Sequence, residues 1–176
     1  MFISVLQKDG KRSKDFWRQY DRGFMEVMNM GIEEFGAAVG GEAAKLFVFT
    51  NETGMEMAVS DYGATLVRIV FPDREGNLCD VTLGYDDVAG YEAGGLFLGA
   101  VVGRNANRIG KASFSINGKE YHLTANDNQN NLHSGPDFYN KRMWQVSGQD
   151  ESSVTFLLHS GDGEQGYPGQ VDIEVT

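Results

Sequence analysis

Hydrophobic and polar residues alternate in short runs along most of the chain, which is the period of a β-strand rather than of a helix. From Lys45 onward, these runs predict strands at residues 45–50, 55–60, 65–71, 144–146, 154–159 and 170–175. Turn residues separate them, as at Asn51-Glu52-Thr53-Gly54 and at Pro72-Asp73. The pattern therefore predicts an all-β chain.

A hairpin is predicted where Asn117-Gly118 lies between Phe114–Ile116 and Tyr121–Leu123. A type I′ turn needs two residues with positive φ, and Asn-Gly meets that need best. The chain also has 23 glycines and almost no helical periodicity. Short strands and frequent turns of this kind predict an antiparallel β-sandwich.

Residues 1–29 differ from the rest. Charge is dense from Lys8 to Arg22, and aromatic residues recur at a spacing of four: Phe16, Tyr20 and Phe24. A basic segment with aromatics is compatible with binding to RNA or to a partner groove, whereas a short helix or a disordered leader is the plainer interpretation. Three methionines stand near its end as alternative starts: Met25, Met28 and Met30. We therefore treat 1–29 as a leader or mis-assigned start, and 30–176 as the domain.

Charge and composition narrow the choice of partners. The chain has 176 residues, a formal net charge of −10 and a pI near 4.7. This acidic balance argues against nucleic acid, which needs a basic face, and against an anionic membrane surface. No apolar run approaches the roughly 20 residues of a membrane helix, and no secretory signal is recognisable. We expect a cytoplasmic protein with a small neutral ligand.

The single cysteine, Cys79, precludes an internal disulfide and is interpreted as a semi-buried small residue just before a strand. His122 and His159 have no Cys, Asp or Glu at ligand spacing, so no metal is expected. No phosphate-binding loop or Ser-centred elbow is present. We expect no cofactor.

Two polar segments carry the candidate chemistry. Gly103-Arg104-Asn105-Ala106-Asn107-Arg108-Ile109 supplies two Arg and two Asn, and Asn130-Asn131-Leu132-His133-Ser134-Gly135 places a histidine 25 positions after Arg108. Arg is a rigid fork of donors, and the Asn amide both donates and accepts, so both suit neighbouring sugar hydroxyls. Histidine can transfer a proton near neutral pH.

These segments resemble those of the aldose 1-epimerase (galactose mutarotase) family, in which Gly-Arg-x-Ala-Asn-Arg-Ile is followed by an Asn-x-Leu-His-Gly-Gly-like segment. Ser134 stands in place of one of the two glycines. Three further segments resemble the family in the same order: Asp61–Thr65, Asp80–Tyr85 (expected as a strand) and Asp162–Gly169. The resemblance extends from about Gly31 to Thr176.

The resemblance implies a galactose mutarotase-like supersandwich that interconverts the α and β anomers of hexoses such as galactose and glucose. Ring opening needs a base for the C1 hydroxyl and an acid for the ring oxygen. The family uses a Glu and a His for these steps, the His in an Asn-His-x-Tyr-Phe-like segment that this chain does not contain. The chain also stops inside a predicted strand at Thr176. We therefore expect the N-terminal part of a longer protein, inactive by itself.

Residue by residue, the resemblance assigns Asn107 and Arg108 to sugar binding. It assigns His133 to contact near the ring oxygen, where it would assist the acid. The plainer alternatives are an arginine that bonds loop carbonyls, a turn asparagine and a structural histidine. Arg104 and Asn105 are interpreted as loop scaffold, and Asp162 and Glu164 as solvated turn residues.

Two other functions stay open. A non-catalytic carbohydrate-binding β-sandwich would use the same Arg, Asn and His. A phosphosugar epimerase of this fold would need further basic groups, which the acidic balance disfavours. The preferred sugar and the oligomeric state do not follow from the sequence.

Overall fold

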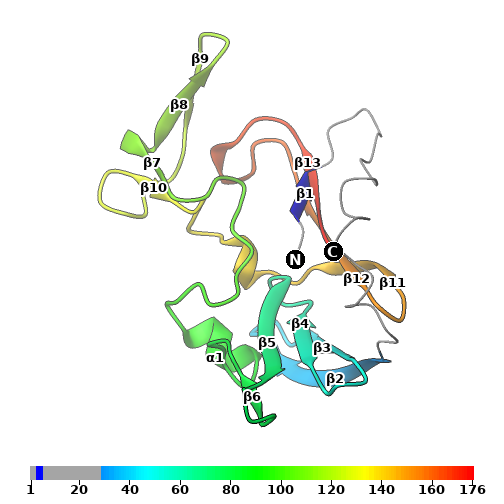
Figure 1. Cartoon of the computed structure of the whole chain (residues 1–176). Helices are drawn as coiled ribbons and strands as arrows, with labels where there is room; N and C mark the ends of the chain where they lie inside the picture. Colours follow the sequence, from blue (N-terminus) through cyan, green and yellow to red (C-terminus); the bar gives the residue numbers. More distant parts are fainter. Residues whose placement is uncertain (1–2, 6–28) are drawn as a thin grey trace, which may run out of the picture.

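Two antiparallel sheets packed face to face form the body of the protein (Figure 1), seen in a computed structural model that describes residues 3–5 and 29–176. The larger sheet consists, in spatial order, of β2 (Asn29–Ala37), β3 (Ala43–Thr50), β4 (Glu56–Ser60), β5 (Thr65–Pro72) and β6 (Leu78–Asp80). The smaller consists of β1 (Ile3–Val5), β13 (Val171–Val175), β12 (Val154–Ser160) and β11 (Gln145–Gln149). The prediction of an all-β antiparallel fold is confirmed.

Two short ladders lie beyond the sheets. One joins β7 (Arg108–Ile109) to β10 (Asn131–Leu132), and the other is a hairpin of β8 (Ser113–Ile116) and β9 (Lys119–His122) that projects from the body (Figure 1). Its turn residues have positive φ, 52° at Asn117 and 78° at Gly118, as the Asn-Gly signal predicts.

The predicted leader of residues 1–29 is described only in part. Residues 1–2 and 6–28, including the charged and aromatic stretch, lie outside the described residues. Ile3–Val5 forms β1 and pairs with β13, and Asn29 begins β2. The boundary at residue 30 therefore stays a prediction.

Strand β3 separates two layers of the core, because successive residues of a strand point to opposite faces. Phe47 and Phe49 face the smaller sheet, where the rings of Phe47 and Phe156 meet edge to face at 5.5 Å. Leu46 and Val48 point the other way, into the cluster that includes residues of helix α1 (Val88–Ala93). Both faces of β3 are covered, so its central residues form an unbroken buried apolar run.

Helix α1 was not predicted, because six residues are too few to show a helical period. The Asp87 side chain accepts from the Gly90 N–H at 2.9 Å and caps its start. At its other end, the Lys141 ammonium donates to the carbonyls of Tyr91, Glu92 and Gly94. None of the described helices is long and apolar enough to cross a membrane.

Two strand assignments need correction. β2 was missed because only Phe35 of its nine residues is buried, so the strand lacks a clear alternation. The expected strand at Asp80–Tyr85 is wrong, because β6 ends at Asp80 and contains Cys79, which is exposed rather than semi-buried. Beyond β6, the backbone of Gly84 lies so close to β5 that an added Cβ would be 2.6 Å from the Val67 carbonyl oxygen.

The Asp61–Thr65 segment anchors the chain that follows the candidate site. The Gly63 N–H donates to the Arg142 carbonyl at 2.8 Å, and the Trp144 N–H donates to the Asp61 carbonyl at 2.9 Å. Gly63 has a φ of 73°, and a Cβ there would lie 2.6 Å from the Asn140 carbonyl oxygen. This close approach explains the glycine in the segment.

We expect Phe47→Ala to lower the free energy of unfolding by about 3–5 kcal/mol, because it removes a ring from the centre of the core. The measurement is urea unfolding followed by tryptophan fluorescence. Phe71→Ala is the matched control, since Phe71 is 43% exposed whereas Phe47 is 1% exposed. The control should cost less than about 1 kcal/mol, and equal losses for the two variants would contradict this description of the core.

Candidate functional site

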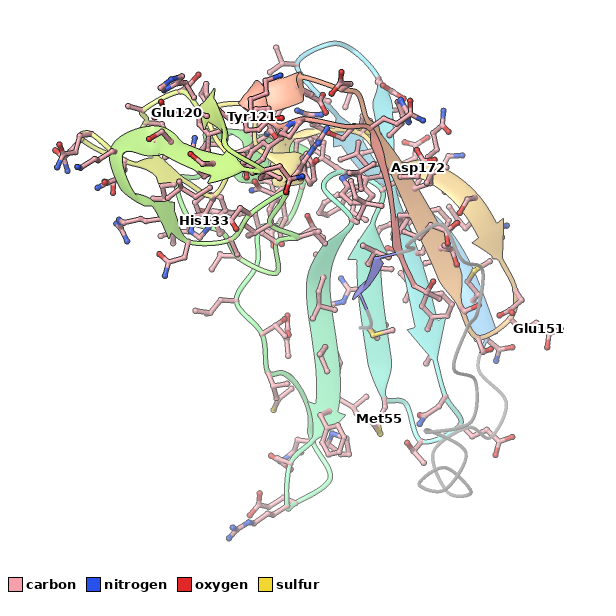
Figure 2. The ribbon with its side chains drawn as sticks, turned by 90° about the horizontal axis from the view of Figure 1, so that it is seen from above. Met55, Glu120, Tyr121, His133, Glu151 and Asp172 are labelled. Atoms are coloured by element: carbon pink, nitrogen blue, oxygen red, sulfur yellow. The ribbon has the colours of Figure 1, made fainter. Side chains whose placement is uncertain are left out.

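The two polar segments meet in the β7–β10 ladder, where Arg108 lies opposite Leu132 and Ile109 opposite Asn131. Beyond the ladder, the His133 N–H donates to the Asn107 carbonyl at 3.0 Å. The Asn107 N–H donates in turn to His133 Nδ1, also at 3.0 Å. Asn107, Arg108 and His133 are therefore neighbours, in the same lobe as the β8–β9 hairpin (Figure 2).

The backbone hydrogen bond from Asn107 fixes the tautomer of His133. Because Nδ1 accepts a hydrogen, the neutral imidazole carries its proton on Nε2. The ring of Phe97 packs on the imidazole with centroids 4.7 Å apart, and Phe138 meets Phe97 edge to face at 5.3 Å. His133 therefore offers an Nε2–H donor from a fixed ring. Phe97 was not predicted, because nothing in its local sequence marks it.

Arg108 has an exposed guanidinium, with 54% of its side chain accessible. Its Nε donates to Asp127 Oδ2 at 2.5 Å, and Nη1 lies 3.5 Å from Asn107 Oδ1. Within the described part of the chain, it has no hydrogen bond to a loop carbonyl, contrary to the plainer alternative. Asp127 was also missed, because it stands in a run of Asn, Asp and Gln that reads only as a turn.

Arg104 has the opposite environment, as its interpretation as scaffold predicts. Its guanidinium donates twice to Ser160 Oγ, at 2.9 and 2.8 Å. It also donates to the carbonyls of Gly161 at 2.5 Å, Gly169 at 2.7 Å and Pro168 at 3.3 Å. Arg104 thus ties the end of β12 to the loop that returns to β13.

Ser134 joins three segments around the site and is fully buried. Its hydroxyl accepts from the Asn105 N–H at 2.8 Å and donates to the Asn105 carbonyl at 3.1 Å. The Tyr167 hydroxyl lies 2.9 Å away. Because the single hydrogen of the Ser134 hydroxyl goes to the Asn105 carbonyl, Tyr167 is the donor in this second contact. The residue that departs from the family motif is therefore part of the support of the site.

Glu164 is not a solvated turn residue, so that prediction is wrong. Its carboxylate accepts from Arg142 Nη1 at 2.6 Å and from the Ser160 hydroxyl, and its side chain is 28% exposed. Burial raises the pKa of Glu164, but hydrogen bonds from Ser160 and Arg142 and the charges of Arg142 and Arg104 outweigh it. The net result is a pKa below the ordinary value of 4.5. Asp162 is exposed and accepts from the Gly169 N–H.

The other two histidines each lie near a carboxylate. His159 Nδ1 is 2.6 Å from Asp172 across β12 and β13, and His122 Nε2 is 3.8 Å from Glu120. Among the residues that the structure describes, no three His, Cys, Asp or Glu side chains are grouped as metal ligands. The expectation of no metal and no cofactor stays a prediction.

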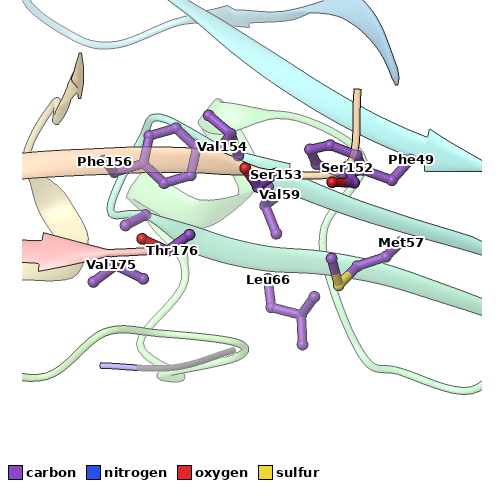
Figure 3. Close-up of a pocket in the computed structure, with 11 residues that line it drawn as sticks. Phe49, Met57, Val59, Leu66, Ser152, Ser153, Val154, Phe156, Val175 and Thr176 are labelled. Atoms are coloured by element: carbon purple, nitrogen blue, oxygen red, sulfur yellow. The ribbon is translucent and has the colours of Figure 1, made fainter. Parts of the chain in front are cut away.

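An apolar cavity of about 270 Å³ lies between the two sheets (Figure 3). Its lining comes from β3, β4, β5, β12 and β13 and is mainly hydrophobic: Phe49, Met57, Val59, Leu66, Val154, Phe156 and Val175. Asn107, Arg108 and His133 are not among the residues that line it. Apart from Ser152, Ser153 and Thr176 the lining is apolar, so this cavity is a poor match for a polyhydroxyl ligand.

Comparison with solved structures places the fold among galactose mutarotase-like epimerases. An aldose epimerase homologue from C. elegans superposes with a TM-score of 0.68 at 31% identity, over 83% of this chain and 41% of that one. Galactose 1-epimerase from Lactobacillus acidophilus NCFM superposes with a TM-score of 0.70 at 23% identity, over 84% and 43%. The chain belongs to the aldose 1-epimerase family, whose family model matches residues 45–176.

Curated relatives agree with this assignment. Aldose 1-epimerase of Haemophilus influenzae is 41% identical over 136 residues, which are 77% of this chain and 39% of that protein. Aldose 1-epimerase of Escherichia coli K12 is 36% identical over 135 residues, again 77% and 39%. Galactose mutarotase of Rattus norvegicus is 39% identical over 139 residues, 78% and 40%. The chain spans about two fifths of the length of these relatives.

We expect neutral His133 to be the Nε2–H tautomer, because its Nδ1 accepts the Asn107 N–H. The measurement is a ¹⁵N long-range NMR correlation spectrum of the chain, recorded at a pH above the titration range of histidine. His133→Gln identifies the signals, and His122 provides an exposed reference ring. A protonated Nδ1 in neutral His133 would rule out this hydrogen bond.

We expect the Glu164 carboxylate to make stability depend on acid pH. Its pKa is lowered in the folded state, so its contribution is complete above the ordinary value and is lost as pH falls through the folded value. Urea unfolding from about pH 7 to about pH 3 should therefore show a smaller loss in Glu164→Gln than in the wild type. Glu151→Gln, an exposed carboxylate at the β11–β12 turn (Figure 2), should keep the wild-type loss. Parallel profiles for Glu164→Gln and the wild type would contradict the prediction.

Proposed function

We propose that this chain supplies the sugar-binding side of an aldose 1-epimerase site that acts on hexoses such as galactose and glucose. The supporting observation is the contact of Asn107, Arg108 and His133 across the β7–β10 ladder in a chain of this family. Each of the three then offers hydrogen-bonding groups to a neutral polyhydroxyl ligand. A cytoplasmic location accompanies this proposal, with neither nucleic acid nor membrane as a partner.

Anomer interconversion proceeds by opening and closing the pyranose ring. A base takes the proton of the C1 hydroxyl, the C1–O5 bond breaks, and an acid protonates O5 to give the open-chain aldehyde. Rotation about C1–C2 and the reverse transfers close the ring on the other face. In this proposal, Arg108 donates to hydroxyls and favours negative charge that develops on oxygen. Asn107 bridges hydroxyls, and His133 donates its Nε2–H near O5, where it assists the acid.

The main acid and base lie outside these 176 residues in this proposal. Two carboxylates around the site are already engaged, since Asp127 is held by Arg108 and Glu164 by Arg142 and Ser160. A carboxylate in an ion pair is a poor proton acceptor. The engagement of both carboxylates also favours the second candidate, a carbohydrate-binding β-sandwich without catalysis.

We expect the 176-residue chain to bind galactose without accelerating its mutarotation. An NMR titration should show shifts at Asn107 and His133, and Arg108→Ala should weaken binding about tenfold or more, because hydrogen bonds from a charged donor are lost. Arg74→Ala is the matched control, since Arg74 is an exposed arginine in the β5–β6 turn. Polarimetry of α-galactose should give the rate of buffer alone.

The two measurements test separate parts of the proposal. A lack of galactose binding by the wild type would overturn the sugar site. Mutarotation well above the rate in buffer would overturn the claim that the acid and base lie outside this chain. Equal losses in Arg108→Ala and Arg74→Ala would remove Arg108 from the site.

A further inference from the structure

The ion pair of Arg108 and Asp127 is the one strong charge contact among the candidate sugar-binding residues. Arg108 Nε lies 2.5 Å from Asp127 Oδ2, and the Asp127 side chain is 25% exposed, against 54% for Arg108. The carboxylate is thus the less accessible partner of the ion pair. No role for Asp127 follows from the sequence motifs.

The turn that carries Asp127 is built into the site. The N–H groups of Asn126 and Asp127 both donate to the Asn130 carbonyl at 3.1 Å, and the Asn130 N–H donates to the Asp127 carbonyl at 2.9 Å. The Asn126 amide bonds both backbone groups of Leu132, at 2.6 and 2.9 Å. Leu132 ends β10 and directly precedes His133, so one set of contacts places both Asp127 and His133.

The contact leaves a defined edge of Arg108 for a ligand. Nε is occupied by Asp127, Nη1 has only the 3.5 Å contact with Asn107, and Nη2 donates to no acceptor in the described residues. Since the guanidinium is planar and rigid, a partner at Nε fixes the direction of the Nη groups. The Asp127 carboxylate also cancels the charge of Arg108 at the site.

We propose that Asp127 is a positioning residue that presents the Nη edge of Arg108 to neutral sugars and reduces the affinity of the site for anionic ones. This inference rests on the proposed function, because it assumes that Arg108 contacts the sugar. Hydroxyl groups need the donors of Arg108 but not its net charge. A carboxylate on the ligand would need that charge, and Asp127 both neutralises it and repels the ligand.

The test compares galactose with galacturonate, which carries a carboxylate at C6, by NMR titration of the wild type and Asp127→Asn. The Asn side chain has nearly the same shape and keeps an oxygen acceptor for Arg108, but it has no charge. We expect the ratio of Kd for galacturonate to Kd for galactose to fall by about threefold to tenfold in Asp127→Asn. Asp127→Ser removes the same charge with a residue common in turns, and provides a second variant if Asp127→Asn does not fold.

Asp172→Asn is the matched control, since it makes the same change in net charge. Asp172 pairs with His159 on the β12–β13 face, away from His133 (Figure 2). Its ratio of the two Kd values should equal that of the wild type. Equal changes in Asp127→Asn and Asp172→Asn would assign the effect to overall charge and overturn the inference.

The positioning role has its own spectroscopic readout, which needs no sugar. The Arg108 Nε–H resonance should be shifted downfield and protected from exchange in the wild type, and should lose both properties in Asp127→Ala. Galactose binding with an unchanged Kd ratio in the uncharged variants would overturn the inference and leave the proposed function intact. Failure of the wild type to bind either sugar would overturn the proposed function and, with it, the selectivity.

Discussion

The short ladder between β7 and β10 is the interaction on which the candidate site depends. Only two residue pairs form it, yet it joins segments that lie more than twenty positions apart in the sequence. The reciprocal hydrogen bonds of Asn107 and His133 continue it by one residue on each strand. Both residues have positive φ, 62° and 53°, so the strands turn away directly after this contact. At this end of the ladder, the side chains of Asn107 and Arg108 are exposed.

So short a ladder needs support from outside, which buried polar contacts supply. Ser134 bonds both backbone groups of Asn105 and meets Tyr167, while Arg104 holds Ser160 and the loop beyond it. Glu164 shares Ser160 with Arg104, and Arg142 balances its charge. Partly buried charges of this kind are costly unless they are paired or hydrogen-bonded. Here Glu164 pairs with Arg142, and Arg104 is hydrogen-bonded to Ser160 and to loop carbonyls. One connected network therefore runs from β12 to the site.

The predictability of the fold from sequence depended on burial. Strands with a core face, such as β4 and β12, alternate clearly and were predicted close to their observed bounds, and β3 was found as a buried apolar run. β2 has one buried residue and α1 has six residues in all, so neither leaves a periodic signal. The Asn-Gly hairpin was predictable because a backbone conformation, rather than packing, selects those two residues.

Some residues of the site were predictable from the sequence, and others were not. Arg108, Asn107 and His133 belong to segments with a family pattern, and the structure places them together. Phe97 packs on the ring of His133, and Asp127 accepts from the guanidinium of Arg108. Both contacts join residues that are distant in sequence, so no local pattern marks Phe97 or Asp127. Glu164 was misread for the related reason that a Gly-rich loop reads as solvated, whereas Arg142, distant in sequence, covers its carboxylate.

The difference between Asp127 and Glu164 shows how one type of side chain serves two purposes around this ladder. Glu164 accepts hydrogen bonds from Ser160 and Arg142, which lower its pKa, so it acts as a fixed negative charge. Asp127 lies at the edge of the site and holds one nitrogen of an exposed arginine. Neither carboxylate is free to take a proton from a sugar hydroxyl, whereas the exposed Arg108 edge and the Nε2–H of His133 are donors. The described groups around the ladder that are free for a ligand are therefore hydrogen-bond donors, which suit the hydroxyl groups of the proposed sugar ligand.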